Sequence, residues 1–238
     1  LKWINGGLGN PAQREIASKV KYVLVAGDIV DGVGVYQDQY DELILKDVKE
    51  QYQMCADFLS QIPQHIRIII SPGNHDATRA AEPQTALADD FAAPLLKLPN
   101  VLSVSNPAVV NIDASKDFPG FDILLYHGYS FDYYVANVDS IRKQGGYDRA
   151  DLIMKFLLQR RHLAPAHTST LILPDQALDP LFIGVVPDIF ATGHVHRTSV
   201  SDYKGVVLIN GSCWQGKTKF QERMGHNPQP ARLPVFNL

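Results

Sequence analysis

The sequence is poor in several features that would each point to a particular class of protein. It holds two cysteines among 238 residues, Cys55 and Cys213, far apart and in unlike contexts. This excludes a disulfide-stapled scaffold and favours buried free thiols in a reducing compartment. No apolar run approaches the roughly 20 residues that span a bilayer, and the first residues show no signal-peptide pattern. We therefore expect a cytoplasmic protein without a membrane partner.

A strong excess of charge of either sign is also missing. The formal net charge is −3 at pH 7, so whole-chain charge neither identifies nor excludes a nucleic-acid-binding protein. We find no internal repeat and no low-complexity tract, and 45% hydrophobic with 20% charged residues is typical of globular proteins. At this length the chain can bury one large core, so we expect one domain over residues 1–238, with or without a small appendage.

The most informative stretch is a short apolar run that ends in a glycine and two carboxylates. Residues 22–26, Tyr-Val-Leu-Val-Ala, predict a strand buried on both faces of a sheet. Gly27 ends the run, and Asp28 and Asp31 follow at once. Open α/β sheets keep their ligands at the carboxyl ends of strands, which favours a binding role. Taken alone, the pattern is explained equally well by Asp28 capping a helix and Asp31 holding a loop.

The same pattern returns three times further along the chain. Apolar runs at 66–70, 121–126 and 188–192 are each followed by a small turn and by residues able to bind a metal ion. Because the carboxyl ends of such strands meet at one rim of a layered α/β fold, we expect these side chains to converge. The predicted ligands are Asp28, Asn74, His127, His194 and His196.

This set mixes nitrogen and oxygen ligands and contains no thiolate. It suits Mn, Fe, Zn or Mg better than a structural zinc or an iron–sulfur cluster. Two cations about 3.5–4 Å apart can clamp a phosphoryl group and ionise a water for in-line attack. Asp28 is placed to bridge the two cations, and His196 to reach the second of them. Any single histidine here fits a structural role better, whereas the joint pattern predicts a di-metal site.

His75 and Asp76 are the predicted catalytic pair beside these ligands. A histidine oriented by a carboxylate can stabilise or protonate a leaving oxygen, and His75 is followed directly by Asp76. Glycines precede the ligands at positions 27, 73 and 193, where the missing Cβ lets the backbone turn sharply.

Basic residues elsewhere give weaker signals. Arg160 and Arg161 form a cluster with His162 that could bind phosphate, although a solvated helix end explains them more simply. Arg79 is similar and lies near the predicted site in sequence. The chain from 214 onward is basic and reads as loop.

Periodicity and chain breakers predict the remaining elements. We expect helices at 14–19, 39–62 and 87–98, one or two strands within 101–112, two helices within 129–163 broken at Gly145-Gly146, and a hairpin over 198–212.

Four segments resemble the calcineurin-like metallophosphoesterase motifs, in their family order. They are Gly27-Asp28-Ile29-Val30-Asp31, Gly73-Asn74-His75-Asp76, His127-Gly128 and Gly193-His194-Val195-His196. The sequence around these motifs resembles the small-subunit family of archaeal family-D DNA polymerases. Examples are Ser-Pro-Gly-Asn-His-Asp-Ala-Thr-Arg and Phe-Ala-Thr-Gly-His-Val-His-Arg. The resemblance covers nearly the whole chain and implies a two-sheet α/β/β/α sandwich.

The resemblance also implies a function. Small subunits of that family carry the 3′→5′ exonuclease used in proofreading and bind the large polymerase subunit. For this chain it implies phosphodiester hydrolysis at a single-stranded 3′ end of DNA with two divalent ions, manganese being expected first. It implies Asp28 as the bridging ligand, Asn74, His127 and His194 on one metal, His196 on the other, and His75 as the catalytic histidine. DNA phosphates would then be the partners of Arg79, Arg160 and Arg161.

One family motif is not found in the sequence. An Asp-x-His at the end of an earlier strand is absent and would lie just upstream of Leu1. The family's N-terminal OB-fold domain is missing as well, and the chain does not begin with Met. We therefore expect an N-terminally truncated fragment that is weakly active or inactive by itself.

Two other functions fit the same motifs. A protein or nucleotide phosphatase would prefer a phosphomonoester to a single-stranded 3′ end, which separates it from a nuclease. A non-catalytic polymerase scaffold is the third reading, and the presence of all five predicted ligands argues against it.

Overall fold

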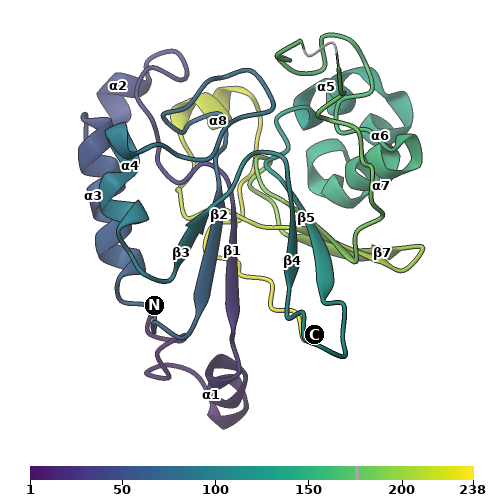
Figure 1. The fold of residues 1–238 in the computed structure, drawn as a ribbon. Coiled ribbons are helices and arrows are strands. Elements are labelled where there is room, and N and C mark those ends of the chain that lie inside the picture. Colours follow the sequence, from purple (N-terminus) through teal and green to yellow (C-terminus); the bar gives the residue numbers. More distant parts are fainter. Residues whose placement is uncertain (175–176) are drawn as a thin grey trace.

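The computed structural model describes residues 1–174 and 177–238, which form four layers. Two β-sheets face each other, and helices cover the outer face of each sheet (Figure 1). This confirms the expected α/β architecture with two sheets between helical layers. No helix in the described part of the chain has the length and apolar character needed to cross a bilayer.

The first sheet is built entirely of parallel strands, in the order β1-β2-β3. Its strands are β1 (Tyr22–Ala26), β2 (Arg67–Ser71) and β3 (Val101–Ser103). Side chains alternate between its faces because strand residues point to opposite sides in turn. Ile68 and Ile70 pack toward the helices, whereas Ile69 packs toward the second sheet. We expected β1 to be fully buried, but all five of its residues are half-buried because β1 is an edge strand.

Two helices cover the outer face of this sheet, α3 (Val48–Leu59) and α4 (Asp89–Leu96). The expected helix over 39–62 is instead two helices, with α2 (Gln39–Glu42) standing apart from α3. The physical reason is the cap of α3. Asp47 has extended backbone and its carboxylate accepts the Lys49 N–H at 2.7 Å, so a new helix begins there.

The second sheet has the order β4-β5-β6-β8-β7, with three parallel central strands and an antiparallel strand at each edge. Its strands are β4 (Ala108–Ile112), β5 (Phe121–Tyr126), β6 (Ile189–Thr192), β7 (Ser199–Tyr203) and β8 (Val206–Asn210). The hairpin β7–β8 is as predicted. The stretch 101–112 forms two strands, and they join different sheets.

The outer face of the second sheet is covered by short helices. They are α5 (Phe131–Asn137), α6 (Asp139–Lys143), the 3₁₀ turn Gly146–Arg149 and α7 (Ala150–Arg160). The predicted break at Gly145 is present, with a φ of 123° that only glycine adopts readily. A second break occurs at Val138, whose backbone is extended. Two further helices, α1 (Pro11–Ser18) and α8 (Lys219–Arg223), lie outside the layers, and α8 was not predicted.

Three apolar clusters hold the layers together. One lies between the first sheet and α3 and α4, and another between the second sheet and α5–α7. The third fills the space between the sheets, where Ile69 meets Ile123, Leu125 and Ile189. The two sheets pack face to face, and the carboxyl ends of their parallel strands point to the same edge of the molecule (Figure 1).

Candidate metal centre

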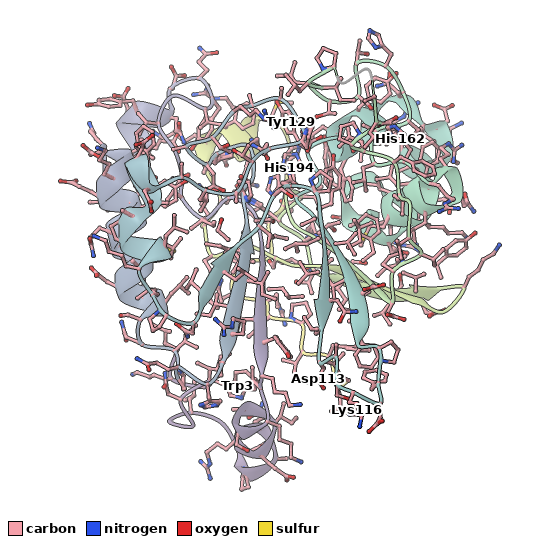
Figure 2. All side chains as sticks on the ribbon, in the orientation of Figure 1. Trp3, Asp113, Lys116, Tyr129, His162 and His194 are labelled. Carbon is pink, nitrogen blue, oxygen red and sulfur yellow. The ribbon has the colours of Figure 1, made fainter. Side chains whose placement is uncertain are left out.

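The predicted ligands meet at the edge where β1, β2, β5 and β6 end. The loops that follow these strands come from both sheets and approach one another across the gap between them. Figure 2 labels His194 and Tyr129 at this edge, opposite the end of the molecule that carries Trp3, Asp113 and Lys116.

The Nε2 atom of His127 lies at the centre of the cluster. It is 3.3 Å from Oδ2 of Asp28, 3.0 Å from Oδ1 of Asn74 and 3.2 Å from Nδ1 of His194. The ligand atoms of Asp28, His127 and His194 lie within 4.8 Å of one another. His127 itself is only 1% exposed, so water cannot satisfy these atoms freely. Four atoms with lone pairs facing one another at this spacing form a donor set that fits a divalent cation.

Hydrogen bonds from outside the cluster fix two of the imidazoles. Nδ1 of His127 lies 2.7 Å from the Ala26 carbonyl, to which it donates, and this leaves Nε2 with its lone pair directed to the cluster. Nε2 of His194 lies 3.0 Å from Oδ2 of Asp132, which leaves Nδ1 for the cluster. A carboxylate behind a ligating histidine raises its basicity and fixes its orientation. Sequence reasoning missed Asp132, because its only signal is contact in space.

Asp28 and His127 each stabilise the charged form of the other. Burial alone would raise the pKa of the Asp28 carboxyl, but the imidazoles of His127, His75 and His194 hold it well below its usual range. Burial alone would lower the pKa of His127, yet the adjacent Asp28 carboxylate raises it to about 9. The site therefore keeps an ionised carboxylate at its centre and attracts positive charge, whether a proton on His127 or a metal cation.

Three glycines allow the loops to approach this closely. A Cβ added at Gly73 would lie 2.3 Å from Oδ1 of Asp28, and one at Gly27 would lie 2.4 Å from Nδ1 of His127. At Gly193 it would lie 2.7 Å from the Ala26 carbonyl oxygen. Only Gly27 has a positive φ, so Gly73 and Gly193 serve close approach rather than the sharp turn we expected.

Three predicted ligands have left-handed backbone. The φ angles are 52° at Asp28, 65° at His194 and 53° at His196. Residues other than glycine adopt this region rarely and at an energetic cost, and they cluster where a side chain must be aimed. The backbone therefore aims these side chains at some expense of local stability.

His75 lies beside the cluster, with Nε2 at 3.9 Å from Oδ2 of Asp28. Its ring is oriented by the Asp31 carbonyl, 2.7 Å from Nδ1, and not by Asp76 as we expected. The Asp76 carboxylate instead accepts the N–H groups of Gly73 and Ile29. It also accepts the hydroxyl of Tyr52, and burial raises its pKa to about 6, with Asp28 adding to the effect. Asp76 thus holds the loop that carries His75.

His196 stands at the border of the cluster and is not part of the three-residue group. Its Nδ1 lies 2.9 Å from Nε2 of Gln221 in α8, and its carbonyl accepts the Gln229 N–H. Burial lowers its pKa to about 4, so the imidazole is neutral at pH 7. The C-terminal segment, expected to be loop, therefore supports a predicted ligand from behind.

A buried polar bridge connects the two sides of the site, and no sequence pattern predicts it. Asn106 is fully buried, and its Oδ1 accepts the His127 N–H at 2.8 Å. Its Nδ2 donates to Oε1 of Gln84 at 2.8 Å, and Nε2 of Gln84 donates to the Gly73 carbonyl at 2.9 Å. Glu82, also buried, accepts from Asn106 and from the Tyr126 hydroxyl. The bridge thereby fixes the loop of the first sheet relative to that of the second.

The predicted phosphate-binding arginines make local contacts. Arg161 donates to the carbonyls of Ile183 and Gly184, and Arg160 lies over the Phe156 ring. Such local contacts fit a helix end better than a phosphate site, and a solvated helix end was the simpler of the two interpretations of this cluster. Arg79 donates to the Pro83 carbonyl. Phosphate binding by any of the three stays a prediction.

The comparison with known families fits this geometry. The family model described as calcineurin-like phosphoesterase matches residues 2–198, most of the chain. The chain belongs to that family. Membership of this family implies the use of metal ions. Such ions would bind among the donor atoms around His127.

Curated relatives match the chain over nearly its whole length. The DNA polymerase II small subunits of Methanothermobacter thermautotrophicus and Methanocaldococcus jannaschii are each 42% identical to it, over 237 and 238 residues. That of Archaeoglobus fulgidus is 40% identical over 236 residues. These alignments cover 100%, 100% and 99% of this chain but 47%, 38% and 46% of the relatives, so the chain spans less than half of their length.

Proposed function

We propose that this phosphoesterase hydrolyses phosphodiester bonds at the single-stranded 3′ end of DNA, as the exonuclease of a polymerase small subunit. The observation that carries the proposal is the group of four donor atoms formed by Nε2 of His127 and the atoms of Asp28, Asn74 and His194 that surround it. The relatives supply the substrate class, since a DNA polymerase subunit acts on DNA.

The proposed metal ligands divide into two groups. Asp28, Asn74, His127 and His194 would hold one cation, and Asp28 with His196 would lie toward a second. Manganese is the cation we expect first, with Mg, Fe and Zn as alternatives. When bound, the cations would supply Lewis acidity and an ionised water for in-line attack.

The chain's own residues would handle the proton. His75 is the proposed general acid, because its Nδ1 is held by the Asp31 carbonyl and its Nε2 lies toward Asp28. In that position Nε2 could protonate the leaving oxygen of the scissile ester. Asp76 acts indirectly, because its carboxylate anchors the loop that carries His75.

The proposal names two partners. One is the 3′ end of single-stranded DNA, and the other is the large polymerase subunit that the name "small subunit" implies for the relatives. An archaeal polymerase acts in the cytoplasm, where the chromosome lies, and the proposed location follows from that partner. A phosphatase and a non-catalytic scaffold remain the alternatives to be tested.

The test is degradation of a primer with a mismatched 3′ end in Mn²⁺, measured for this chain and for a version extended upstream by the relatives' preceding segment. We expect mononucleotides to be released, slowly by this chain and faster by the extended one, and His75→Ala to stop the release in both. Hydrolysis of small phosphomonoesters without cleavage of DNA would replace the nuclease by a phosphatase. Inactivity on both substrates, with binding to a polymerase large subunit retained, would favour a non-catalytic scaffold.

A further inference from the structure

A cavity of about 780 Å³ opens directly beside the metal centre. Two of its lining residues also touch the centre. Asp132 holds the imidazole of His194, and the ring of Tyr129 meets that imidazole edge-on, with ring centroids 5.7 Å apart. Figure 2 shows Tyr129 next to His194, and His162, a third lining residue, further out over the helices. Whatever occupies the cavity therefore lies next to the bond on which the centre would act.

Hydrogen bonds hold the walls of the cavity in place. The Tyr134 hydroxyl donates to Oγ of Ser169 at 3.0 Å and accepts the Ala166 N–H at 3.2 Å. Nε2 of His162 lies 2.8 Å from Oδ2 of Asp179. The segment that carries these lining residues is thus part of the folded structure and forms a ready-made wall.

The lining favours a flat, uncharged ligand. It contains two tyrosine rings and no lysine or arginine, so a phosphate in the cavity would find no fixed cation and would face Asp132. Within residues 1–174 and 177–238, neither the Tyr129 nor the Tyr133 hydroxyl has a hydrogen-bond partner, so both are open to a ligand. The lining residues are Tyr129, Asp132, Tyr133, His162, Ala164, Ala166, His167, Thr168, Ser169, Thr170, Leu171 and Ile172.

We propose that this cavity binds the 3′-terminal nucleoside of the strand, with its base stacked against Tyr133 and its sugar toward Tyr129. The idea rests on the proposed function and adds to it the recognition of the strand end. Aromatic side chains stack on any base, so such a pocket would accept all four nucleotides, as proofreading requires. The volume lies within the range of about 300–1,000 Å³ found for small-molecule sites.

The first experiment tests the cavity without the metal. The fluorescent nucleoside 2-aminopurine deoxyriboside is titrated with the protein in EDTA, where stacking quenches its emission. We expect saturable quenching with the wild type and with Tyr133→Phe, which keeps the ring, and about tenfold or more weaker binding with Tyr133→Leu. Tyr203→Leu, the same change on β7 away from the cavity, should behave as the wild type. Absence of saturable quenching by the wild type, or equal quenching by Tyr133→Leu, would overturn the proposal.

The second experiment separates this proposal from the proposed function. Wild type and Tyr133→Leu are compared in Mn²⁺ on two oligonucleotides, one with a normal 3′ end and one with an abasic 3′ residue. The wild type should prefer the normal end about tenfold in kcat/KM, and in Tyr133→Leu this ratio should fall toward one. Cleavage of both oligonucleotides at equal rates by the wild type would refute the nucleoside site but not the nuclease activity. Hydrolysis of bis-p-nitrophenyl phosphate without cleavage of DNA would refute the nuclease activity. The titration in EDTA would still decide whether the cavity binds a nucleoside.

Discussion

At the scale of single residues, His127 shows how the site is built. Its ring is buried, one nitrogen is held by the Ala26 carbonyl, and the other faces three donor atoms of Asp28, Asn74 and His194. Every contact that fixes the ring leaves Nε2 available to a ligand in the centre. We therefore expect the residues behind the candidate ligands to affect metal binding as well as the candidate ligands themselves.

Replacing Asp132 tests this second layer. Asp132→Asn removes the charge behind His194 while keeping the size of the side chain. We expect Mn²⁺ to bind about 10- to 100-fold more weakly in calorimetry, because the carboxylate no longer raises the basicity of the imidazole. Asp139→Asn, on the neighbouring helix α6, is the matched control. Unchanged Mn²⁺ affinity in Asp132→Asn would show that His194 does not depend on this contact.

Gly73→Ala tests the close approach of the loops. The new methyl group would lie 2.3 Å from Oδ1 of Asp28 and 2.7 Å from Cε1 of His127, so one loop must move. We expect the free energy of unfolding to fall by about 1–3 kcal/mol in urea titrations, with Mn²⁺ binding weakened as well. Gly184→Ala, where nothing lies within 4 Å of the added carbon, should change neither quantity. If Gly73→Ala behaved like Gly184→Ala, the loops would be looser than the structure indicates.

The sequence predicted which side chains meet in this cluster but not the residues that support them. Asp28, His127 and His194 follow apolar runs, a pattern visible without a structure. Asp132 and Asn106 carry no such pattern, because each acts through one hydrogen bond to a residue distant in sequence. The orientation of His75 was predicted from its sequence neighbour Asp76, whereas a backbone carbonyl supplies it.

At the scale of elements, helix α3 is tied to the loop that carries His75. The Tyr52 hydroxyl donates to Oδ1 of Asp76 at 2.9 Å and accepts the Ala77 N–H at 3.0 Å, fully buried. Tyr52→Phe leaves a buried carboxylate without this donor, so we expect a loss of about 1–3 kcal/mol in the free energy of unfolding. Tyr40→Phe, at an exposed position of helix α2, is the control and should have no effect. Equal stability of the two variants would refute the tie.

The bridge between the sheets makes stability depend on pH. Burial raises the pKa of Glu82 above its ordinary value, although the hydroxyl of Tyr126 and the amide of Asn106 offset part of the rise. The folded state therefore binds the proton more tightly than the unfolded state. The contribution of Glu82 to stability is highest below the ordinary glutamate pKa of about 4.5 and falls as pH rises from there through the folded-state pKa.

Glu82→Gln should remove this dependence. In EDTA, we expect Glu82→Gln to gain stability relative to the wild type as pH rises from about 4 to 7, as seen in the difference between their unfolding free energies. Urea titrations at several pH values measure it. A difference that stays constant over this range would mean that Glu82 has the same pKa in both states.

Elements were predicted where the apolar pattern determines them. The four motif strands and the β7–β8 hairpin follow from runs of apolar residues, and the break at Gly145 follows from its backbone freedom. The division of 39–62 into two helices depends on the Asp47 cap, which competes with a continuous helical pattern. Helix α8 has five residues and a capping box between Thr218 and Gln221, too short for periodicity to reveal.

At the scale of the whole molecule, the candidate ligands come from both sheets. Asp28 and Asn74 follow strands of one sheet, and His127 and His194 follow strands of the other. A cation bound there would bind only the folded protein with both sheets packed, so it should stabilise the fold. At 100 times its dissociation constant, Mn²⁺ should add about 2.7 kcal/mol to the free energy of unfolding.

Urea titrations with Mn²⁺ and with EDTA measure this gain. Asp28→Ala should abolish the gain, and Asp113→Ala, at the opposite end of the molecule (Figure 2), should leave it intact. A gain that survives in Asp28→Ala would place the bound manganese elsewhere.

The three apolar clusters contain none of the five predicted ligands. The apolar packing that holds the layers together is thus made by other residues than the predicted ligands. Asp28, His194 and His196 even have backbone that glycine or asparagine would adopt with less strain, so drift at these positions would favour their loss. Only selection for activity would keep them, and a lineage released from that selection should retain the sandwich and its surfaces while the metal centre decays.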